Sequence, residues 1–274
     1  MFILSKYIVS SLLLMFLFAS CKDNVAGNND DSSGMKLVWS DEFDYTGLPD
    51  SAKWNYDIGA SGWGNNELQY YSDDPLNVRV ENGMMIIEAL RHPGRQPEYS
   101  SSRVTTRGRA GWTYGRFEIR AKLPSGRGTW PAIWMLPLQW NYGNGGWPDN
   151  GEIDIMEHVG YDPGVIHAST HCHTYNWPNN TQKTATINIP DAQDNFHSYI
   201  LEWDADKMET YVDSIKYFTS ENDSSGWQGW PFNKPFYLIM NIAIGGDWGG
   251  AQGVDPSIFP QRMEIDYVRV YQKK

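Results

Sequence analysis

The sequence predicts an all-β protein, a β-sandwich of jelly-roll type, and three observations support this. Short alternating or uniformly apolar runs recur along the chain, separated by clusters of Gly, Asn, Asp and Pro. The 26 glycines and 15 prolines supply the frequent turns that such a fold needs. No long amphipathic helix and no internal repeat interrupts the pattern. Two antiparallel sheets packed face to face accommodate many short strands of this kind.

The chain begins with a segment that predicts export. In residues 1–20 a single Lys6 precedes an apolar run of the length of a secretory signal peptide, which is shorter than a membrane-spanning helix. Ala19 and Ser20 directly precede Cys21, which resembles the cleavage site of bacterial lipoproteins, where the new N-terminal cysteine is lipidated. We therefore expect an exported lipoprotein, anchored through Cys21 at the periplasmic face of a membrane or at the cell surface. An ordinary signal peptide with an incidental cysteine is the alternative.

The next segment predicts a tether. Residues 21–34 are polar and lack an apolar period, as in a flexible linker. The only other cysteine is Cys172, so a lipidated Cys21 leaves no partner for a disulfide. The folded domain is expected over residues 35–274, a length of about 240 residues that all-β sandwiches reach as one domain. Nothing in the sequence calls for more than a monomer.

The strand candidates of this domain differ in how their apolar residues are arranged. Residues 115–122 and 263–271 alternate apolar and polar side chains, which is typical of a strand with one face in solvent. Residues 236–244 are almost all apolar, which favours a strand buried on both faces. Further short candidates are residues 84–89, 199–203 and 208–212.

Composition excludes two classes of protein. The 33 acidic residues outnumber the 22 basic ones, giving a formal net charge of −11, whereas nucleic-acid binders carry a basic patch. Charged residues are only 20% and hydrophobic ones 41%, which excludes a disordered chain. Aromatic residues reach 14%, including 13 Trp, and indicate surfaces lined by rings.

Three acids within six residues carry the candidate chemistry. On a regular strand Glu152 and Asp154 share one face, while Glu157, at an odd offset, points away. One extra residue near Ile155 and Met156, a β-bulge, would return Glu157 to the face of the other two. Two acids flanking a glycosidic bond can cleave it by double displacement. The same acids could equally form a solvated edge that prevents self-association, so the pattern alone leaves both interpretations open.

The surroundings of these acids resemble a known family. Residues 147–157, WPDNGEIDIME, are similar to the catalytic signature of glycoside hydrolase family 16, in the bulged form of its laminarinases, agarases and carrageenases. The resemblance covers nearly all of residues 35–271 and implies a jelly roll with a concave glycan-binding cleft that hydrolyses internal β-glucan bonds with retention. Other segments fit the laminarinase branch in the right order: residues 39–43, 62–71, 112–118, 130–137, 196–199, 241–250 and 266–270.

The resemblance also implies residue roles, with no cofactor for catalysis. Glu152 corresponds to the nucleophile, Glu157 to the acid/base and Asp154 to an assisting carboxylate. Trp248 joins the candidates because it lies in a Gly-rich loop, and loops carry function. Sugar rings offer C–H faces to aromatic planes and hydroxyls to fixed polar groups, although core packing is the alternative for each Trp. The implied substrate-binding residues are Asn65, Arg103, Trp130, Trp134, Trp147 and His171.

Two kinds of metal site are considered. His167, His171 and His173 share strand parity, but Cys172 falls on the opposite face and no zinc motif is present, which favours hydrogen bonding in the cleft wall. Members of the family often carry a structural calcium, and the hard oxygen donors that Ca²⁺ prefers are available at the matching positions. We expect such an ion to stabilise the fold without taking part in catalysis. The matching ligands are Glu42, the carbonyl of Gly83 and Asp266.

Together these features predict a retaining endo-β-1,3-glucanase, a laminarinase, whose partner is a β-glucan polysaccharide. Mixed-linkage β-1,3-1,4-glucan is a second candidate substrate. An agarase- or carrageenase-type hydrolase is less favoured because a cleft for sulfated galactans would need more Arg or Lys. A non-catalytic glycan-binding surface lipoprotein is the alternative from another class, and the intact pair of Glu152 and Glu157 disfavours it.

Overall fold

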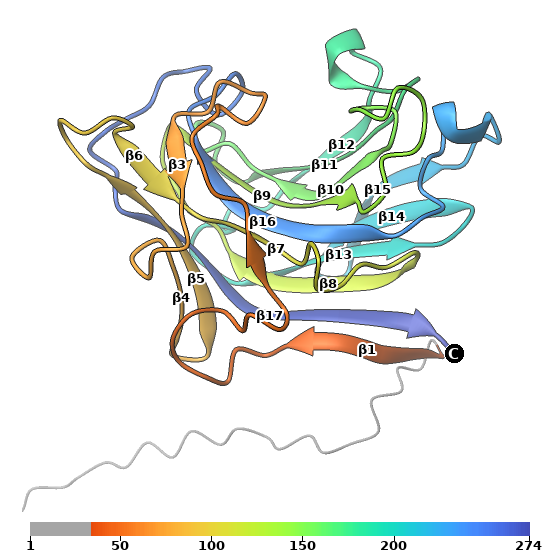
Figure 1. Cartoon of the computed structure of the whole chain (residues 1–274), viewed down its shortest axis with the longest axis horizontal. Helices are drawn as coiled ribbons and strands as arrows, with labels where there is room; N and C mark the ends of the chain where they lie inside the picture. Colours follow the sequence, from red (N-terminus) through yellow and green to blue (C-terminus); the bar gives the residue numbers. More distant parts are fainter. Residues whose placement is uncertain (1–33) are drawn as a thin grey trace, which may run out of the picture.

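The computed structural model describes residues 34–274, and all of its regular structure beyond two single helical turns is strand (Figure 1). The expected signal peptide and lipidated Cys21 lie outside the described residues and stay predictions. Within residues 34–274 no helix is long and apolar enough to cross a membrane. The two turns are η1 (Trp177–Asn179) and η2 (Gly226–Gln228).

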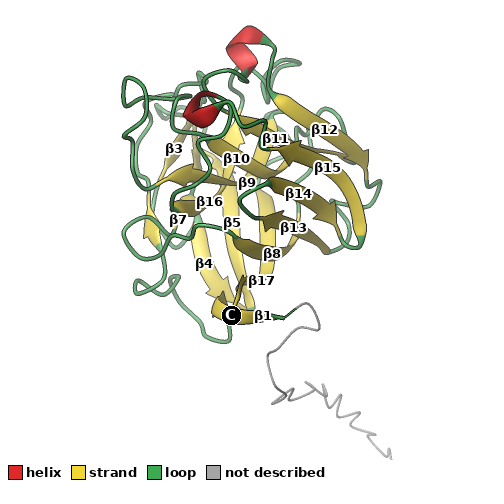
Figure 2. Cartoon of the chain, turned by 90° about the vertical axis from the view of Figure 1, so that its right-hand side faces the viewer, coloured by secondary structure: helices red, strands yellow, loops and turns green. Residues whose placement is uncertain are grey.

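Two large sheets face each other and form the predicted sandwich (Figure 2). Pairing is antiparallel throughout, except between the short strands β3 and β6. The first sheet has ten strands: β1 (Met35–Asp41), β3 (Gln69–Tyr71), β4 (Val78–Glu81), β5 (Met84–Arg91), β6 (Tyr99–Ser101), β8 (Gly115–Lys122), β13 (His197–Trp203), β14 (Lys207–Val212), β15 (Ile215–Glu221) and β17 (Gln261–Lys273). The second has seven: β2 (Asn55–Tyr56), β7 (Arg103–Thr105), β9 (Thr129–Pro137), β10 (Glu152–Glu157), β11 (Val165–His171), β12 (Lys183–Asn188) and β16 (Phe236–Ile244).

The hydrophobic patterns of the strands match their positions. β16 covers residues 236–244, is buried along its whole length and lies in the seven-stranded sheet between β9 and β7. β8 alternates buried and half-buried residues because one face packs on the core and the other faces outward. The sequence therefore predicted the bounds and the burial pattern of these two strands.

The core fills the space between the two sheets. Burying each large apolar side chain there stabilises the fold by about 1.5–3 kcal/mol. The core thus covers one face of the seven-stranded sheet. The other face is concave, with loops rising at both ends (Figure 1), and we call this concave face the trough. Fully buried side chains come from both sheets: Phe117, Ile119, Val268 and Val270 from one, and Ile133, Met135, Ile153, Leu238 and Met240 from the other.

Candidate active site

The strand β10 carries the three acids on one face because its pairing is irregular. Opposite β9, Asp154 pairs with Trp134 and Met156 with Ile133, so Ile155 has no partner of its own. This extra residue is the β-bulge that the sequence predicted, and it turns Glu157 to the side of Glu152 and Asp154. All three acids line one pocket in the trough of the seven-stranded sheet. Ile155 itself is fully buried in the core.

Each glutamate has its own hydrogen-bond partner. Trp147 Nε1 donates to Glu152 Oε2 at 2.8 Å, and Trp130 Nε1 donates to Glu157 Oε1 at 3.0 Å. These two indole donors serve opposite ends of the strand, one for each glutamate. Both hold a carboxylate oxygen in place while leaving the other oxygen of that group for a substrate.

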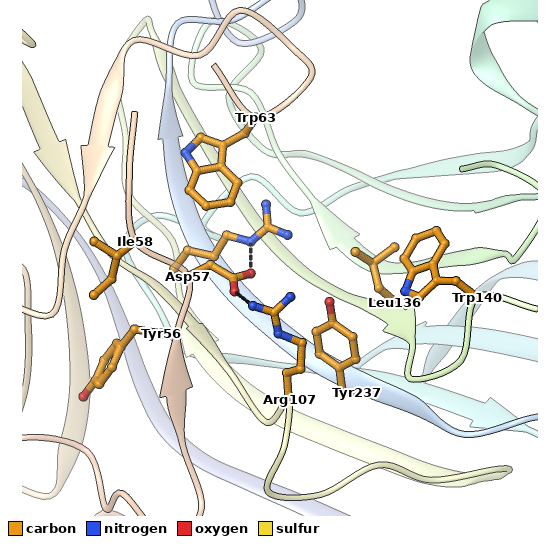
Figure 3. A pocket seen from close by; sticks show the side chains of 9 residues that line it. Tyr56, Asp57, Ile58, Trp63, Arg107, Leu136, Trp140 and Tyr237 are labelled. Carbon is orange, nitrogen blue, oxygen red and sulfur yellow. Dashed lines mark hydrogen bonds and ion pairs between the residues drawn. The ribbon is translucent and has the colours of Figure 1, made fainter. Parts of the chain in front are cut away.

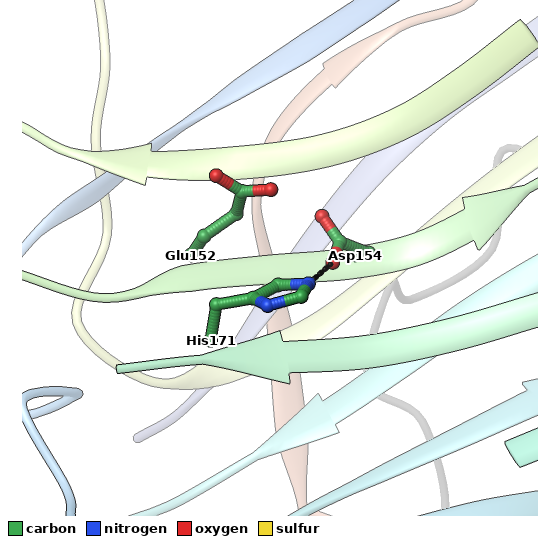
Figure 4. Close-up of side chains that lie close together, drawn as sticks. All are labelled: Glu152, Asp154 and His171. Atoms are coloured by element: carbon green, nitrogen blue, oxygen red, sulfur yellow. Dashed lines mark ion pairs between the residues drawn. The ribbon is translucent and has the colours of Figure 1, made fainter. Parts of the chain in front are cut away.

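His171 serves the central acid. It lies opposite Glu152 in the β10–β11 pair, yet its ring reaches the next acid along, and Nε2 is 3.2 Å from Asp154 Oδ2 (Figure 4). Asp154 is only 2% exposed, and because this contact lacks hydrogen-bond alignment, Oδ2 has no hydrogen-bond partner among the described residues. Donor atoms of Glu152, Asp154 and His171 lie within 4.8 Å of one another.

Crowding of the acids changes their proton affinity. Burial, reinforced by the charge of Asp154, raises the pKa of Glu152 to about 8. Burial and the charge of Glu152 raise the pKa of Glu157 to about 7. Burial and the charge of Glu157 raise the pKa of Asp154 well above its usual range. Because each charge opposes the next, the trio retains protons at neutral pH, when an exposed carboxyl would have none.

The expected binding residues gather around this trio, and their roles stay predictions. Asn65, Arg103, Trp130 and Trp134 line the same pocket as the three acids. Trp147 is 37% exposed beside Glu152, so it presents part of its ring to solvent.

Trp248 contacts Trp130, which lines the pocket. Its ring meets Trp130 edge-on at 5.5 Å and His167 edge-on at 4.8 Å. It therefore supports the Trp130 ring, whose N–H reaches Glu157.

The histidine and cysteine side chains diverge, as strand parity predicts for Cys172. Cys172 is buried in the core, and its Sγ contacts the carbonyl of Gly229. His173 leaves the trough and bonds Asp149 at 2.7 Å. His167 packs against Trp248, so these residues do not converge on one point in the described chain.

Several cleft residues were missed by sequence reasoning. Trp63, Glu67, Asn241, Ala132 and Ala243 also line the pocket. They all lie in segments whose resemblance to the family was noted, which was the available signal. Their side chains could not be assigned to the cleft without knowing which strands are neighbours.

The cleft continues past Arg103 into a second hollow of about 430 Å³ (Figure 3). The Arg103 guanidinium lies between the rings of Trp63 and Trp134, at 4.9 and 4.7 Å from their centroids. Asp57 bonds both Arg103, at 3.1 Å, and Arg107. Aromatic faces and fixed charged donors thus line the trough well beyond the acids.

The positions expected for calcium lie along β17 and its neighbours β1 and β5 in the ten-stranded sheet, which we call the outer sheet. Asp266 lies where β17 changes its partner from β5 to β1, Glu42 follows β1, and Gly83 precedes β5. Each carboxylate, however, is engaged by an arginine. Arg269 donates to both oxygens of Glu42 at 3.0 and 2.7 Å, and Arg120 lies 2.6 Å from Asp266. An ion there would have to displace these ion pairs.

Comparison with known proteins agrees with the geometry. The model of the family described as glycosyl hydrolases family 16 matches residues 57–269. The chain belongs to this family. The resemblance stated from the sequence, and the jelly-roll sandwich it implied, are confirmed.

Individual relatives cover nearly the whole domain. A Rhodothermus marinus protein named beta-glucanase is 51% identical over 98% of this chain and 96% of its own length. The structure of the laminarinase from Rhodothermus marinus matches with a TM-score of 0.85 at 55% identity, covering 87% of this chain and 97% of that one. SCLam, described as a non-specific endo-β-1,3(4)-glucanase and co-crystallised with 1,3-β-D-cellotriosyl-glucose, matches with a TM-score of 0.83 at 49% identity, covering 88% and 96%.

Proposed function

We propose that the protein is a retaining endo-β-1,3-glucanase that hydrolyses internal bonds of laminarin-like β-glucans. The observation that carries this is the bulged strand β10, which places Glu152, Asp154 and Glu157 together in an aromatic-lined trough. Relatives that are named or described as laminarinase and endo-β-1,3(4)-glucanase support the substrate class. A trough that continues past Arg103 into the second hollow suits cleavage inside a polymer, because it offers room for further sugar units beside the reacting bond.

In the proposed reaction Glu157 acts first as the acid. Its raised pKa, about 7, keeps a proton on the group near neutral pH. Glu157 gives that proton to the glycosidic oxygen while Glu152 attacks the anomeric carbon, so the old C–O bond breaks as a glycosyl-enzyme ester forms. Glu157, now a carboxylate, takes a proton from water, and the hydroxide formed attacks the same carbon and releases Glu152. Two inversions give net retention.

Glu152 has to be ionised to attack, and its neighbours serve this. The Trp147 N–H and the nearby His171 both favour the charged form of Glu152. A proton held by Asp154 removes the like charge that otherwise raises the pKa of Glu152. Asp154 thus assists as a proton-holding neighbour that His171 orients.

Product analysis tests the proposal. The purified protein is incubated with laminarin, with mixed-linkage lichenan and with agarose, and products are followed by chromatography and NMR. Early mid-length oligosaccharides from laminarin, formed first in the β configuration, are the expected result, with slower release from lichenan. Cleavage of agarose alone would assign a galactan hydrolase, and binding of laminarin without products would assign a glycan-binding protein.

We propose further that Cys21 anchors the protein to a membrane through a lipid. The support is the sequence alone: the apolar run of residues 1–20, with Ala19 and Ser20 before the cysteine. Expressed with its own leader in bacteria, the full chain should appear in the membrane fraction, and Cys21→Ala should shift it to the soluble fraction. Equal distribution of both forms would contradict lipidation.

Calcium at Glu42, Gly83 and Asp266 is proposed as a stabilising ion only. The three positions lie on or next to the neighbouring strands β1, β5 and β17, which supports it, and hard oxygen donors suit Ca²⁺. Adding calcium to chelator-treated protein should raise its melting temperature without changing the rate on laminarin. An unchanged melting temperature would mean that Arg120 and Arg269 keep the carboxylates for themselves.

A further inference from the structure

A fourth carboxyl group lines the cleft and has no part in the reaction just described. Glu67 lies in the segment that runs beside the end of β16, where it pairs with Gly245 in an isolated bridge. The next residue, Leu68, donates its backbone N–H to the carbonyl of Ile244 at 2.9 Å, which fixes the segment to the sheet. Glu67 shares the pocket of the three acids but lies on a different element.

Both oxygens of Glu67 accept hydrogen bonds. Asn65 Nδ2 donates to Oε1 at 3.3 Å. Gln69 Nε2 donates to Oε2 at 2.6 Å, and the Tyr71 hydroxyl donates to the same oxygen at 3.1 Å. Gln69 and Tyr71 are fully buried, so their donors cannot turn to water instead. Three donors directed at one group define a site for an acceptor, and an ionised carboxylate is acceptor-only.

The hydrogen-bond network around Glu67 continues through residues of the cleft floor, and each of its bonds has a fixed direction. The Trp134 indole can only donate, and it donates to Asn241 Oδ1 at 2.8 Å. Asn241 therefore turns its Nδ2 to the hydroxyl of Tyr71, at 3.0 Å, and that hydroxyl must pass its own hydrogen on to Glu67. Every hydrogen bond in this series donates toward Glu67, and Glu67 is the final acceptor.

The same carboxylate determines what Asn65 offers to a ligand. Asn65 lines the cleft, and since Glu67 takes its Nδ2, the carbonyl Oδ1 is left with no hydrogen-bond partner in the described part of the chain. Arg103 stands nearby between Trp63 and Trp134 and supplies donors. An acceptor beside a guanidinium donor suits the hydroxyls of a sugar, each of which both donates and accepts.

We propose that Glu67 is a positioning residue for the glycan: its carboxylate fixes the Asn65 amide so that the carbonyl oxygen faces the cleft and accepts a sugar hydroxyl. This inference rests on the proposed function, because it assigns a role in binding the same β-glucan. Glu67 does not touch the reacting bond, and its contribution belongs to substrate affinity rather than to the chemical step.

Exchange of Glu67 for its amide tests the direction of the bonds while keeping their shape. In Glu67→Gln, the carbonyl oxygen still accepts from Gln69 and Tyr71, but an NH₂ group now faces Asn65. Two donors cannot pair, so the Asn65 amide turns over and presents NH₂ to the sugar. We expect KM for laminarin to rise about tenfold, with kcat changed less than about threefold. The Kd for a laminari-oligosaccharide should rise by the same factor when calorimetry is done on proteins that also carry Glu152→Ala, so that the ligand is not cleaved.

A second substitution should repair the first. Asn65→Asp alone places two carboxylates side by side and should weaken binding by a similar factor. When Asn65→Asp is combined with Glu67→Gln, the introduced aspartate accepts from the introduced amide NH₂ with one oxygen and offers the other oxygen to the sugar. The double variant should bind within about threefold of the parent. Losses that simply multiply in the double variant, or a fall in kcat with unchanged Kd in Glu67→Gln, would overturn the proposal.

Controls separate this result from other causes. Glu118→Gln removes a carboxylate that accepts from Tyr267 at 2.7 Å and from Arg116 at 3.1 Å on the other sheet, and it should leave KM and Kd unchanged. Melting temperatures of all variants show whether a loss reflects unfolding. Calorimetry needs no turnover, so absence of cleavage by the parent would contradict the proposed function while the binding cycle still decides on Glu67.

Discussion

The two sheets of the sandwich both carry glutamates, but their surroundings shift the pKa of these side chains in opposite directions. On the outer sheet, Glu209 lies between Lys216 and Lys207, at 2.8 and 2.9 Å, and these hydrogen bonds lower its pKa. In the trough, Glu152 and Glu157 are surrounded by each other, by Asp154 and by indole rings, and their pKa values rise. Both sets of acids lie on strands, and in the trough the bulge at Ile155 is needed to bring Glu157 to the side of Glu152. What differs is the neighbouring charge: compensated acids stabilise the fold, whereas uncompensated ones hold and release protons.

The largest effect is expected at the nucleophile. Glu152→Ala removes the group that forms the ester, so kcat on laminarin should fall on the order of 10⁴-fold or more. Added azide should restore part of the turnover by entering the space left by the side chain, giving an α-glycosyl azide that NMR identifies. The matched outer-sheet change, Glu202→Ala, removes a partner of Arg116 and should alter kcat less than about twofold. A β-configured azide product would exchange the roles of Glu152 and Glu157.

The second-largest effect is expected at Glu157, the proposed general acid. Glu157→Gln should lower kcat by about 10²–10⁴-fold on laminarin, and much less on an aryl glycoside whose leaving group needs no proton. The parent enzyme should lose kcat/KM as the pH rises through about 7, because Glu157 then gives up its proton. That basic limb should be absent from the variant's pH profile on the aryl substrate. A limb that persists unchanged in Glu157→Gln would assign it to another group.

Stability against pH gives a smaller effect with opposite signs on the two faces. A carboxyl whose folded pKa is raised stabilises the fold at low pH and loses that contribution as the pH rises through the folded pKa. Glu157→Gln, which cannot ionise, should therefore be more stable than the parent at pH 9 by roughly 1–3 kcal/mol, and close to it at pH 4. Urea unfolding at both pH values measures this. A variant less stable than the parent at pH 9 would show that the ionised Glu157 does not destabilise the folded protein.

Much of this contrast could be predicted from the sequence, and the limits have physical causes. The burial of the nine residues of β16, all apolar except Asn241, and the bulge at Ile155 depend on local periodicity, which the sequence displays. The hydrogen-bond partners in the cleft depend instead on distant pairing, as when the Tyr71 hydroxyl meets Asn241 across 170 positions of the chain. The two-residue strand β2 is too short to show a period, so the Asp57 that follows it could not be placed beside Arg103.

The smallest effect tests the compensated side of the comparison. Glu209→Gln removes the negative charge between two lysines, and the pKa of Glu209 is lowered in the folded protein. Its contribution is present at neutral pH and is lost as the pH falls through the folded pKa, so the variant should be less stable than the parent at pH 7 by about 0.5–1 kcal/mol, and equal to it near pH 3. Raising the salt concentration should shrink the difference at pH 7, because ions screen pairs whose lysines are exposed, as Lys207 and Lys216 are. A variant more stable than the parent at pH 7 would mean that the charge of Glu209 destabilises the fold, as the charges of the trough acids do. Pairing with lysines would then not explain why the pKa values of the acids differ between the two sheets.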